Sequence, residues 1–379
     1  MIGQQWKRIV VKVGSALIAP DGQGCSTRYL LSIAHFIQQC QHQGVEVILV
    51  SSGAVAAGRQ AIPFPHPTLP ITIKQAMAAI GQQQMMQLWG KLLDRPCAQI
   101  LVTHADFEQR NRYINIANTV RALLQYHAVP VFNENDSVAT RELKVGDNDN
   151  LAALVAMLSD ADALLICSDV DGLFTANPRL DRSATLLREV SAITPAIFAM
   201  AGGSHHSVGT GGMHTKLQAA AKATAAGIAT VILNGQQAAQ LDALAHGQSV
   251  GTLFLPQQER RSARKHWLLQ TARSQGQLLL DAGAVTALTT QGASLLGKGV
   301  VQVLGDFDKG DSVSLHRLQP DGTCGASIGI GICQYSAAEL RQIMGLHSSQ
   351  ITEVLGYCPS ETVIHRDDLV LRDGVPHGN

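Results

Sequence analysis

Short runs rich in β-branched residues alternate over residues 8–233 with longer stretches of helical spacing. This alternation is typical of βαβ units, and it predicts an α/β fold with an open, mainly parallel sheet and helices on both of its faces. We expect strands at residues 8–13, 45–50, 98–103, 129–133, 163–167 and 229–233, and helices at residues 27–43, 72–93, 114–126, 150–158 and 215–226.

The pattern changes after about Pro256. From Gly276 onward, short apolar runs are separated by glycine and aspartate turns, which predicts a second, small and mainly β domain. A chain of 379 residues is long enough for two or three domains. We therefore expect an α/β domain at residues 1–256, a polar linker at 257–275, the small domain at 276–358 and a polar tail at 359–379.

Composition excludes several classes of protein. The 29 basic and 29 acidic side chains balance, so no overall field attracts the chain to nucleic acid or to a membrane. The seven cysteines are dispersed and never form a C-x-x-C pair, which argues for reduced thiols and against disulfides or a zinc site. The apolar runs have the length of strands, and no signal segment opens the chain. We expect a cytoplasmic protein with no membrane segment and no metal held by the chain alone.

Four glycine-containing polar segments stand at the ends of expected strands or at the start of an expected helix. Glycine lets backbone N–H groups approach an anion closely, and ligands of open α/β sheets bind beyond the carboxyl ends of the strands. The clustered acids of the third segment suit an ammonium group. Together the segments indicate phosphoryl transfer to an amino acid; they are VVKVGS (10–15), VSSGAVAAG (50–58), NENDSVATRELKVGDNDN (133–150) and GTGGMHTK (209–216).

Lys12 and Lys216 are the candidate phosphate ligands. Lys12 ends the first expected strand above the Gly14-Ser15 turn, although a solvated lysine at a strand end is the alternative. Lys216 follows a glycine-rich turn at the start of a helix, where backbone amides and the positive helix end attract phosphate. A side-chain carboxylate with a pKa of about 4.3 is ionised at neutral pH, so the reaction needs positioning and charge neutralisation and no general base.

The acceptor site needs the opposite charges. An amino acid brings an ammonium group, which Asp136 and the VGDNDN loop (145–150) can bind, and carboxylates, which Asn148 and Ser52 can bind with neutral donors. The alternative is that these acids form solvent-facing turns or a helix cap.

The four segments, in this order and spacing, resemble those of glutamate 5-kinases within the amino acid kinase family, and the resemblance extends over about residues 8–365. It implies the amino acid kinase fold and ATP-dependent phosphorylation of the γ-carboxylate of L-glutamate, with Mg²⁺, for proline synthesis. It also implies that Asp149 orients the two lysines, and that ATP contacts Lys12 and Lys216 together with Ser168, Asp169, Thr210, Gly211, Gly212, Met213, His214 and Thr215. Ser168, where relatives often have threonine, and His214 are mild departures from the family pattern.

The resemblance further implies inhibition by proline, assembly into dimers or tetramers, and delivery of the product to a glutamyl phosphate reductase. The region at 276–358 resembles a PUA domain. It carries more acidic than basic side chains, which makes RNA an unlikely partner and favours a regulatory or architectural role. Two alternatives stay open: a related kinase with another acceptor, such as aspartate or acetylglutamate, and an RNA-binding role of the PUA-like domain.

Overall fold

A computed structural model of the chain describes residues 6–66, 68–138, 148–201, 212–257, 275–319 and 321–372. It divides into two compact units: Met1–Phe107 with Thr119–Arg260, and Glu108–Asn118 with Arg261–Asn379. Among the described helices, none combines the length and apolar character needed to cross a bilayer.

The first unit is built on an eight-stranded sheet with the order β3-β4-β2-β1-β5-β7-β8-β6. All neighbouring pairs from β3 to β7 are parallel, whereas β8 runs antiparallel to β7. This confirms the predicted open, mainly parallel sheet. Its strands are β1 (Arg8–Val13), β2 (Glu46–Ser51), β3 (Cys97–Val102), β4 (Val129–Glu134), β5 (Ala163–Ser168), β6 (Glu189–Val190), β7 (Ala229–Asn234) and β8 (Thr252–Phe254).

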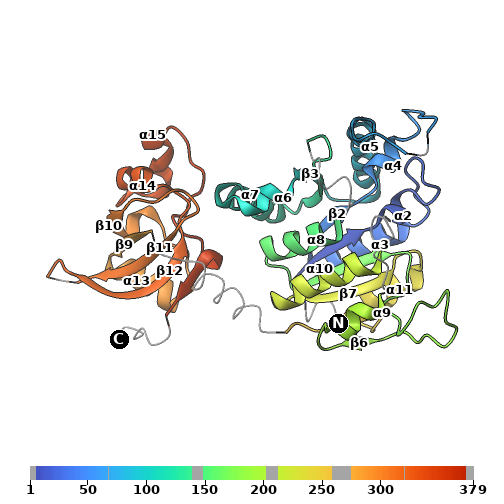
Figure 1. Ribbon diagram of the computed structural model, residues 1–379. Coiled ribbons are helices and arrows are strands. Elements are labelled where there is room, and N and C mark those ends of the chain that lie inside the picture. The colour runs from blue at the N-terminus through green and yellow to red at the C-terminus, as the bar shows by residue number, and fades with distance from the viewer. Residues whose placement is uncertain are drawn as a thin grey trace. The chain divides into compact units, whose positions relative to one another are not determined.

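Helices cover both faces of this sheet (Figure 1). The five predicted helices are confirmed, with ends shifted by a few residues; α7, for example, begins earlier than expected, at Arg110. The described helices before residue 257 are α2 (Ser15–Ile18), α3 (Leu30–His42), α4 (Ala54–Gly58), α5 (Ile71–Leu92), α6 (His104–Glu108), α7 (Arg110–Gln125), α8 (Asn148–Leu158), α9 (Pro195–Met200), α10 (Met213–Ala225) and α11 (Ala238–Ala245). The first part of α7, up to Asn118, belongs to the second unit.

Strand β1 lies in the middle of the sheet, and its side chains alternate between the two layers that cover the sheet. Ile9, Val11 and Val13 are fully buried in a core that includes α3 and Trp89 of α5. Because successive side chains of a strand point to opposite faces, Lys12 faces the other layer, which contains α8 and α10. The strand therefore directs one buried cation toward the N-terminal ends of two helices.

Helices α4 and α5 approach one another at two glycines. A Cβ atom on Gly58 would lie 1.9 Å from the carbonyl oxygen of Met77, and a Cβ atom on Gly81 would lie 1.9 Å from that of Ala54. No side chain fits at either position, so the two backbones are in direct contact. Since only two residues separate the end of β2 from the start of α4, this contact holds α5 beside the carboxyl edge of the sheet.

The second unit contains a five-stranded sheet with the order β10-β9-β11-β12-β13, which confirms a small, mainly β domain. Its core extends into the predicted tail, because Val363 and Ile364 are fully buried and β13 pairs with β12. The elements are β9 (Gly276–Leu280), α13 (Ala282–Thr290), η2 (Gly297–Gly299), β10 (Val300–Gly305), β11 (Ser312–Leu318), β12 (Cys324–Ile332), α14 (Ala337–Ile343), η3 (Ser348–Gln350), α15 (Ile351–Leu355), η4 (Arg366–Asp368) and β13 (Leu369–Leu371).

Candidate active site

The carboxyl ends of the central strands bring distant segments of the chain together. Lys12 of β1 is in register with Val50 of β2 and with Ile166 of β5. The residues that follow these strands, Ser52 and Asp169 among them, therefore lie at one edge of the sheet. This is the edge at which open α/β sheets bind ligands.

Lys12 and Lys216 are held by one carboxylate. Lys12 Nζ lies 2.7 Å from Oδ1 of Asp149, and Lys216 Nζ lies 3.2 Å from Oδ2 of the same residue. Thr215 donates its hydroxyl hydrogen to Asp149 Oδ2 over 2.7 Å. The side chains of Lys12, Lys216 and Asp149 are 6%, 5% and 1% exposed, so the cluster is nearly removed from solvent.

The charges in this cluster depend on one another. Burial alone would raise the pKa of Asp149, but the two lysines and the hydrogen bonds from Lys12 and Thr215 outweigh it and lower the pKa to about 2. Burial lowers the pKa of Lys216, Lys12 lowers it further, and Asp149 opposes the change. The carboxylate thus stays ionised and compensates the two neighbouring ammonium groups.

Two cavities meet at this cluster. The first, named here the β2 cavity, has a volume of about 310 Å³ and the second, the β5 cavity, of about 640 Å³. Lys12 and Ser15 line both. The β2 cavity is further lined by Ser52, Gly53, Ala54, Val55, Ala56, Arg59, Lys74, Asn133, Glu134, Asp136 and Asn148. The β5 cavity is further lined by Gly14, Ala16, Ser168, Asp169, Val170, Gly172, Leu173, Phe174, Ala176, Asn177, Pro178, Arg179, Met200, Ala201, Gly212, Met213 and Lys216.

Comparison with known proteins assigns the chain to a family. The profile of the amino acid kinase family matches residues 7–234, and that of the PUA domain matches residues 276–355. The chain is 51% identical to a glutamate 5-kinase of Idiomarina loihiensis, over 98% of this chain and 99% of the relative, and 52% identical to one of Salinibacter ruber, over 97% of each. The chain belongs to the glutamate 5-kinase family.

Among solved structures, a UMP kinase of Bacillus anthracis covers 67% of this chain and 97% of its own at 18% identity, with a TM-score of 0.45. That likeness is too weak to add to the assignment. The confirmed fold and the near-complete coverage of the relatives make the chain a kinase of the glutamate 5-kinase family with a PUA domain.

In this glutamate 5-kinase family member, the β2 cavity holds both signs of charge. Arg59 follows α4 and Lys74 lies in α5, whereas Glu134 and Asp136 come from the end of β4. Burial raises the pKa of Asp136 to about 6. The cavity therefore suits a small molecule that carries both an ammonium group and carboxylates.

Ser52, Asp136 and Asn148, which the sequence predicted as substrate ligands, lie around this one cavity. Asn148 is the first residue of α8, and its Nδ2 donates to Ser52 Oγ over 3.0 Å. The turn that presents Ser52 requires Gly53, whose φ of +97° lies in the left-handed region that favours glycine. These positions agree with the prediction, whereas the roles of the residues stay predictions.

The residues predicted to contact ATP lie at the β5 cavity or beside it. Ser168 Oγ donates to Asp169 Oδ1 over 3.0 Å, and both residues line the cavity. Gly212 caps α10 and Met213 begins it, so the N-terminal end of this helix faces the same space. The ring of His214 instead lies against Phe198, with centroids 5.6 Å apart. Thr210 and Gly211 lie outside the described residues.

Three further basic side chains that line the cavities were not predicted from the sequence. Arg59 and Lys74 line the β2 cavity, and Arg179 lines the β5 cavity. None of the three stands in a glycine-rich motif or directly after one of the expected strands. Arg59 directly follows the segment 50–58, which is a local signal for it, whereas the positions of Lys74 and Arg179 depend on tertiary packing.

Proposed function

We propose that this enzyme transfers the γ-phosphoryl group of ATP to the γ-carboxylate of L-glutamate and forms L-glutamyl 5-phosphate. In this proposal the reaction is the first step of proline synthesis. The observation that carries the proposal is the shared wall of the two cavities: Lys12 and Ser15 line both. A donor in one cavity and an acceptor in the other would thus meet at a single buried cation.

The β5 cavity suits the nucleotide. Phe174 and Met200 supply apolar surface, whereas Lys12, Lys216 and the N-terminal end of α10 supply positive charge for phosphates. A cavity with an apolar part and a cationic end matches the chemistry of a nucleoside triphosphate. We assign ATP to it.

The β2 cavity suits the acceptor. Asp136 and Glu134 can pair with the α-ammonium group of glutamate, and Arg59 and Lys74 can pair with its α-carboxylate. The Ser52 hydroxyl is then available to the γ-carboxylate. The charge pattern favours a free amino acid over acetylglutamate, which has no ammonium group for Asp136.

The chemistry requires charge neutralisation and no proton transfer. The attacking carboxylate, with a reference pKa of about 4.3, is ionised at neutral pH. Negative charge on the transferred phosphoryl group is stabilised by Lys12 and Lys216, and one well-placed cation is worth roughly 10³ to 10⁵ in rate in enzymes that use one. Asp149 positions both ammonium groups without contacting the substrate in this scheme.

Mg²⁺ fits the site as a companion of the nucleotide. Within the described residues, no group of three or more histidine, cysteine, aspartate or glutamate side chains is arranged to hold a metal ion. Asp169 is the described carboxylate that lines the β5 cavity. The phosphates and Asp169 would hold the ion, which supplies further neutralisation of phosphate charge.

Trapping of the acyl phosphate tests this function. Enzyme, ATP, Mg²⁺ and hydroxylamine are incubated with L-glutamate, and hydroxamate is measured; parallel reactions contain aspartate or N-acetylglutamate. Hydroxamate from glutamate alone is the expected result. Turnover of another acceptor in place of glutamate would retain the kinase and discard the substrate.

We further propose inhibition by proline, assembly into dimers or tetramers, and delivery of the labile product to a glutamyl phosphate reductase in the cytoplasm. Proline carries an ammonium group and a carboxylate, so Asp136 and Arg59 could bind it where they bind glutamate. Inhibition that is competitive with glutamate and noncompetitive with ATP is expected. Inhibition competitive with ATP alone would contradict a shared site.

For the small domain we propose an architectural or regulatory role, with the catalytic part at residues 1–256, a linker at 257–275 and the PUA-like part at 276–358. The acidic side chains of that region oppose binding to a polyanion. RNA binding by the full chain that weakens steeply with salt would contradict this assignment.

A further inference from the structure

A chain of hydrogen-bonded side chains leads away from the β2 cavity. Asn148 Nδ2 donates to Ser52 Oγ over 3.0 Å and to Asn133 Oδ1 over 2.9 Å. Asn133 Nδ2 donates to Gln82 Oε1 over 2.9 Å, and Gln82 Nε2 donates to Gln99 Oε1 over 3.1 Å. We name these five residues the amide relay. It joins the turn after β2 to α8, β4, α5 and β3.

One backbone group sets the direction of every hydrogen bond in the amide relay. The backbone N–H of Glu134 donates to Asn133 Oδ1 over 2.9 Å, and a backbone N–H cannot change roles. Asn133 must therefore point its Oδ1 toward the N–H of Glu134 and its NH₂ group toward Gln82. Gln82 can accept only with its own oxygen, so its NH₂ group points to Gln99.

The directions of these hydrogen bonds decide which polar groups of Asn148 and Ser52 remain available to a substrate in the β2 cavity. Asn148 must donate to Asn133, and the same NH₂ group donates to Ser52 Oγ. Because the Ser52 oxygen accepts that bond, its hydroxyl hydrogen is left for a substrate carboxylate. Asn148 Oδ1 is buried and has no hydrogen-bond partner within the described residues, so it remains an acceptor for a substrate donor.

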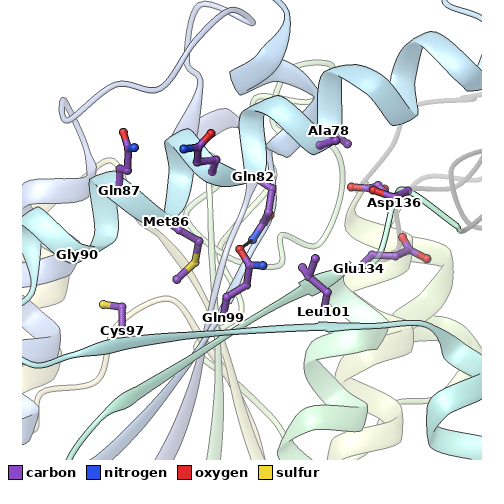
Figure 2. Close-up of a pocket in the computed structure, with 13 residues that line it drawn as sticks. Ala78, Gln82, Met86, Gln87, Gly90, Cys97, Gln99, Leu101, Glu134 and Asp136 are labelled. Carbon is purple, nitrogen blue, oxygen red and sulfur yellow. Dashed lines mark hydrogen bonds between the residues drawn. The ribbon is translucent and has the colours of Figure 1, made fainter.

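Gln82 is the buried link of the amide relay on α5. It is 7% exposed, and it uses both ends of its amide. Its neighbour Gly81 contacts the backbone of α4, which fixes the helix at this point. Figure 2 shows Gln82 and Gln99 facing one another at a cavity of about 660 Å³ between α5 and the sheet.

We propose that Gln82 is a positioning residue for the acceptor. By accepting from Asn133 Nδ2 it holds the Asn133 amide in place. The Asn133 oxygen in turn holds the amide of Asn148, and thereby the hydroxyl of Ser52, in the position that binds the substrate carboxylate. Gln82 does not line the β2 cavity, so it acts without touching the acceptor. This inference rests on the proposed function, because the acceptor is taken to bind in the β2 cavity.

The test compares Gln82→Met with a neighbour on the same helix. Methionine has a similar length and no amide, so Asn133 loses its acceptor while the volume is kept. We expect KM for L-glutamate to rise about tenfold, which corresponds to about 1.4 kcal/mol, with kcat and KM for ATP within about twofold of wild type. Gln83→Met changes an exposed residue of α5 and should leave all three constants unchanged.

A second pair of variants addresses the outer end of the amide relay. Gln99→Glu keeps the oxygen that accepts from Gln82, so KM for glutamate should stay near the wild-type value. Gln99→Met removes this acceptor at an exposed position and should raise KM severalfold. This pair also decides the matter if Gln82→Met fails to fold.

Two results would overturn the inference. One is an unchanged KM for glutamate in both methionine variants. The other is a fall in kcat and in melting temperature together with a rise in KM for both substrates, since that pattern indicates a purely structural role. Wild-type enzyme that does not phosphorylate glutamate would instead refute the proposed function, so the two failures are distinguishable.

Discussion

Lys12 and Lys216 contact different oxygens of one carboxylate, that of Asp149. Two ammonium groups in a nearly dry site repel one another, and a single buried anion between them offsets this repulsion. The lysines are thereby held at the place where the two cavities meet. We expect the two lysines to lose their positions, and the fold to lose stability, when the carboxylate is removed.

Asp149→Asn should abolish most activity and destabilise the fold. Asparagine fits the space but leaves two buried cations without a counter-ion, which costs roughly 3–5 kcal/mol when one partner of a buried pair is removed. We expect kcat to fall by at least about 10² and the urea midpoint of unfolding to fall with it. Asp94→Asn, at an exposed position, is the control. A stable variant with wild-type kcat would show that the carboxylate has neither role.

Binding of glutamate should weaken in mild acid. The pKa of Asp136 is raised to about 6 by burial, so this carboxyl is ionised only above that pH. Because the ionised form binds an ammonium group, kcat/KM for glutamate should fall as the pH falls through about 6. The reacting carboxylate titrates near pH 4.3 and is separated from this step. Asp136→Asn should have a low kcat/KM with no such step, and a step that persists in this variant would assign it to another group.

Removal of a basic side chain that lines the β2 cavity should weaken the binding of one substrate only. Lys74→Met is expected to raise KM for glutamate about tenfold, because a charge-assisted hydrogen bond is lost, while KM for ATP changes little. Arg59→Met should act in the same direction. Lys91→Met changes an exposed lysine of the same helix and serves as the control. If KM for ATP rises and that for glutamate does not, the assignment of the two cavities is reversed.

The contact between α4 and α5 gives a matched pair of glycine substitutions. Gly81→Ala places a methyl group against the carbonyl oxygen of Ala54 and should destabilise the enzyme by about 1–3 kcal/mol or more. Gly90→Ala on the same helix meets open space and should be neutral or stabilise by about 0.4–1 kcal/mol. Denaturant unfolding of both variants measures the difference. Equal stability of the two would contradict the close approach.

The first half of the site is predictable from sequence because its signals are local. Lys12 follows a β-branched run and precedes a glycine turn. Ser52 has the same surroundings at the end of the second expected strand. A motif directly after a strand must lie at the carboxyl edge of the sheet. For these residues, strand order and the two-residue period of side chains suffice.

The other half depends on contacts between distant segments. Lys74 and Gln82 sit on α5, which reaches the site only through the approach of Gly58 and Gly81, and no local pattern reports that approach. Two short strands were not predicted from the sequence for a related reason. Strand β8 has three residues, as has β13, and in so short a run the apolar pattern does not stand out from that of a loop.

Hydroxamate formation by wild type and by Lys216→Ala, each with saturating ATP, Mg²⁺ and L-glutamate, shows whether phosphoryl transfer takes place beside Lys216. We expect product from wild type and a kcat lower by about 10³ in the variant, because one cation at the transferred phosphoryl group is lost. Binding of glutamate, measured separately, should change little. A variant that forms hydroxamate at the wild-type rate would contradict the placement of phosphoryl transfer at the Lys12–Asp149–Lys216 cluster.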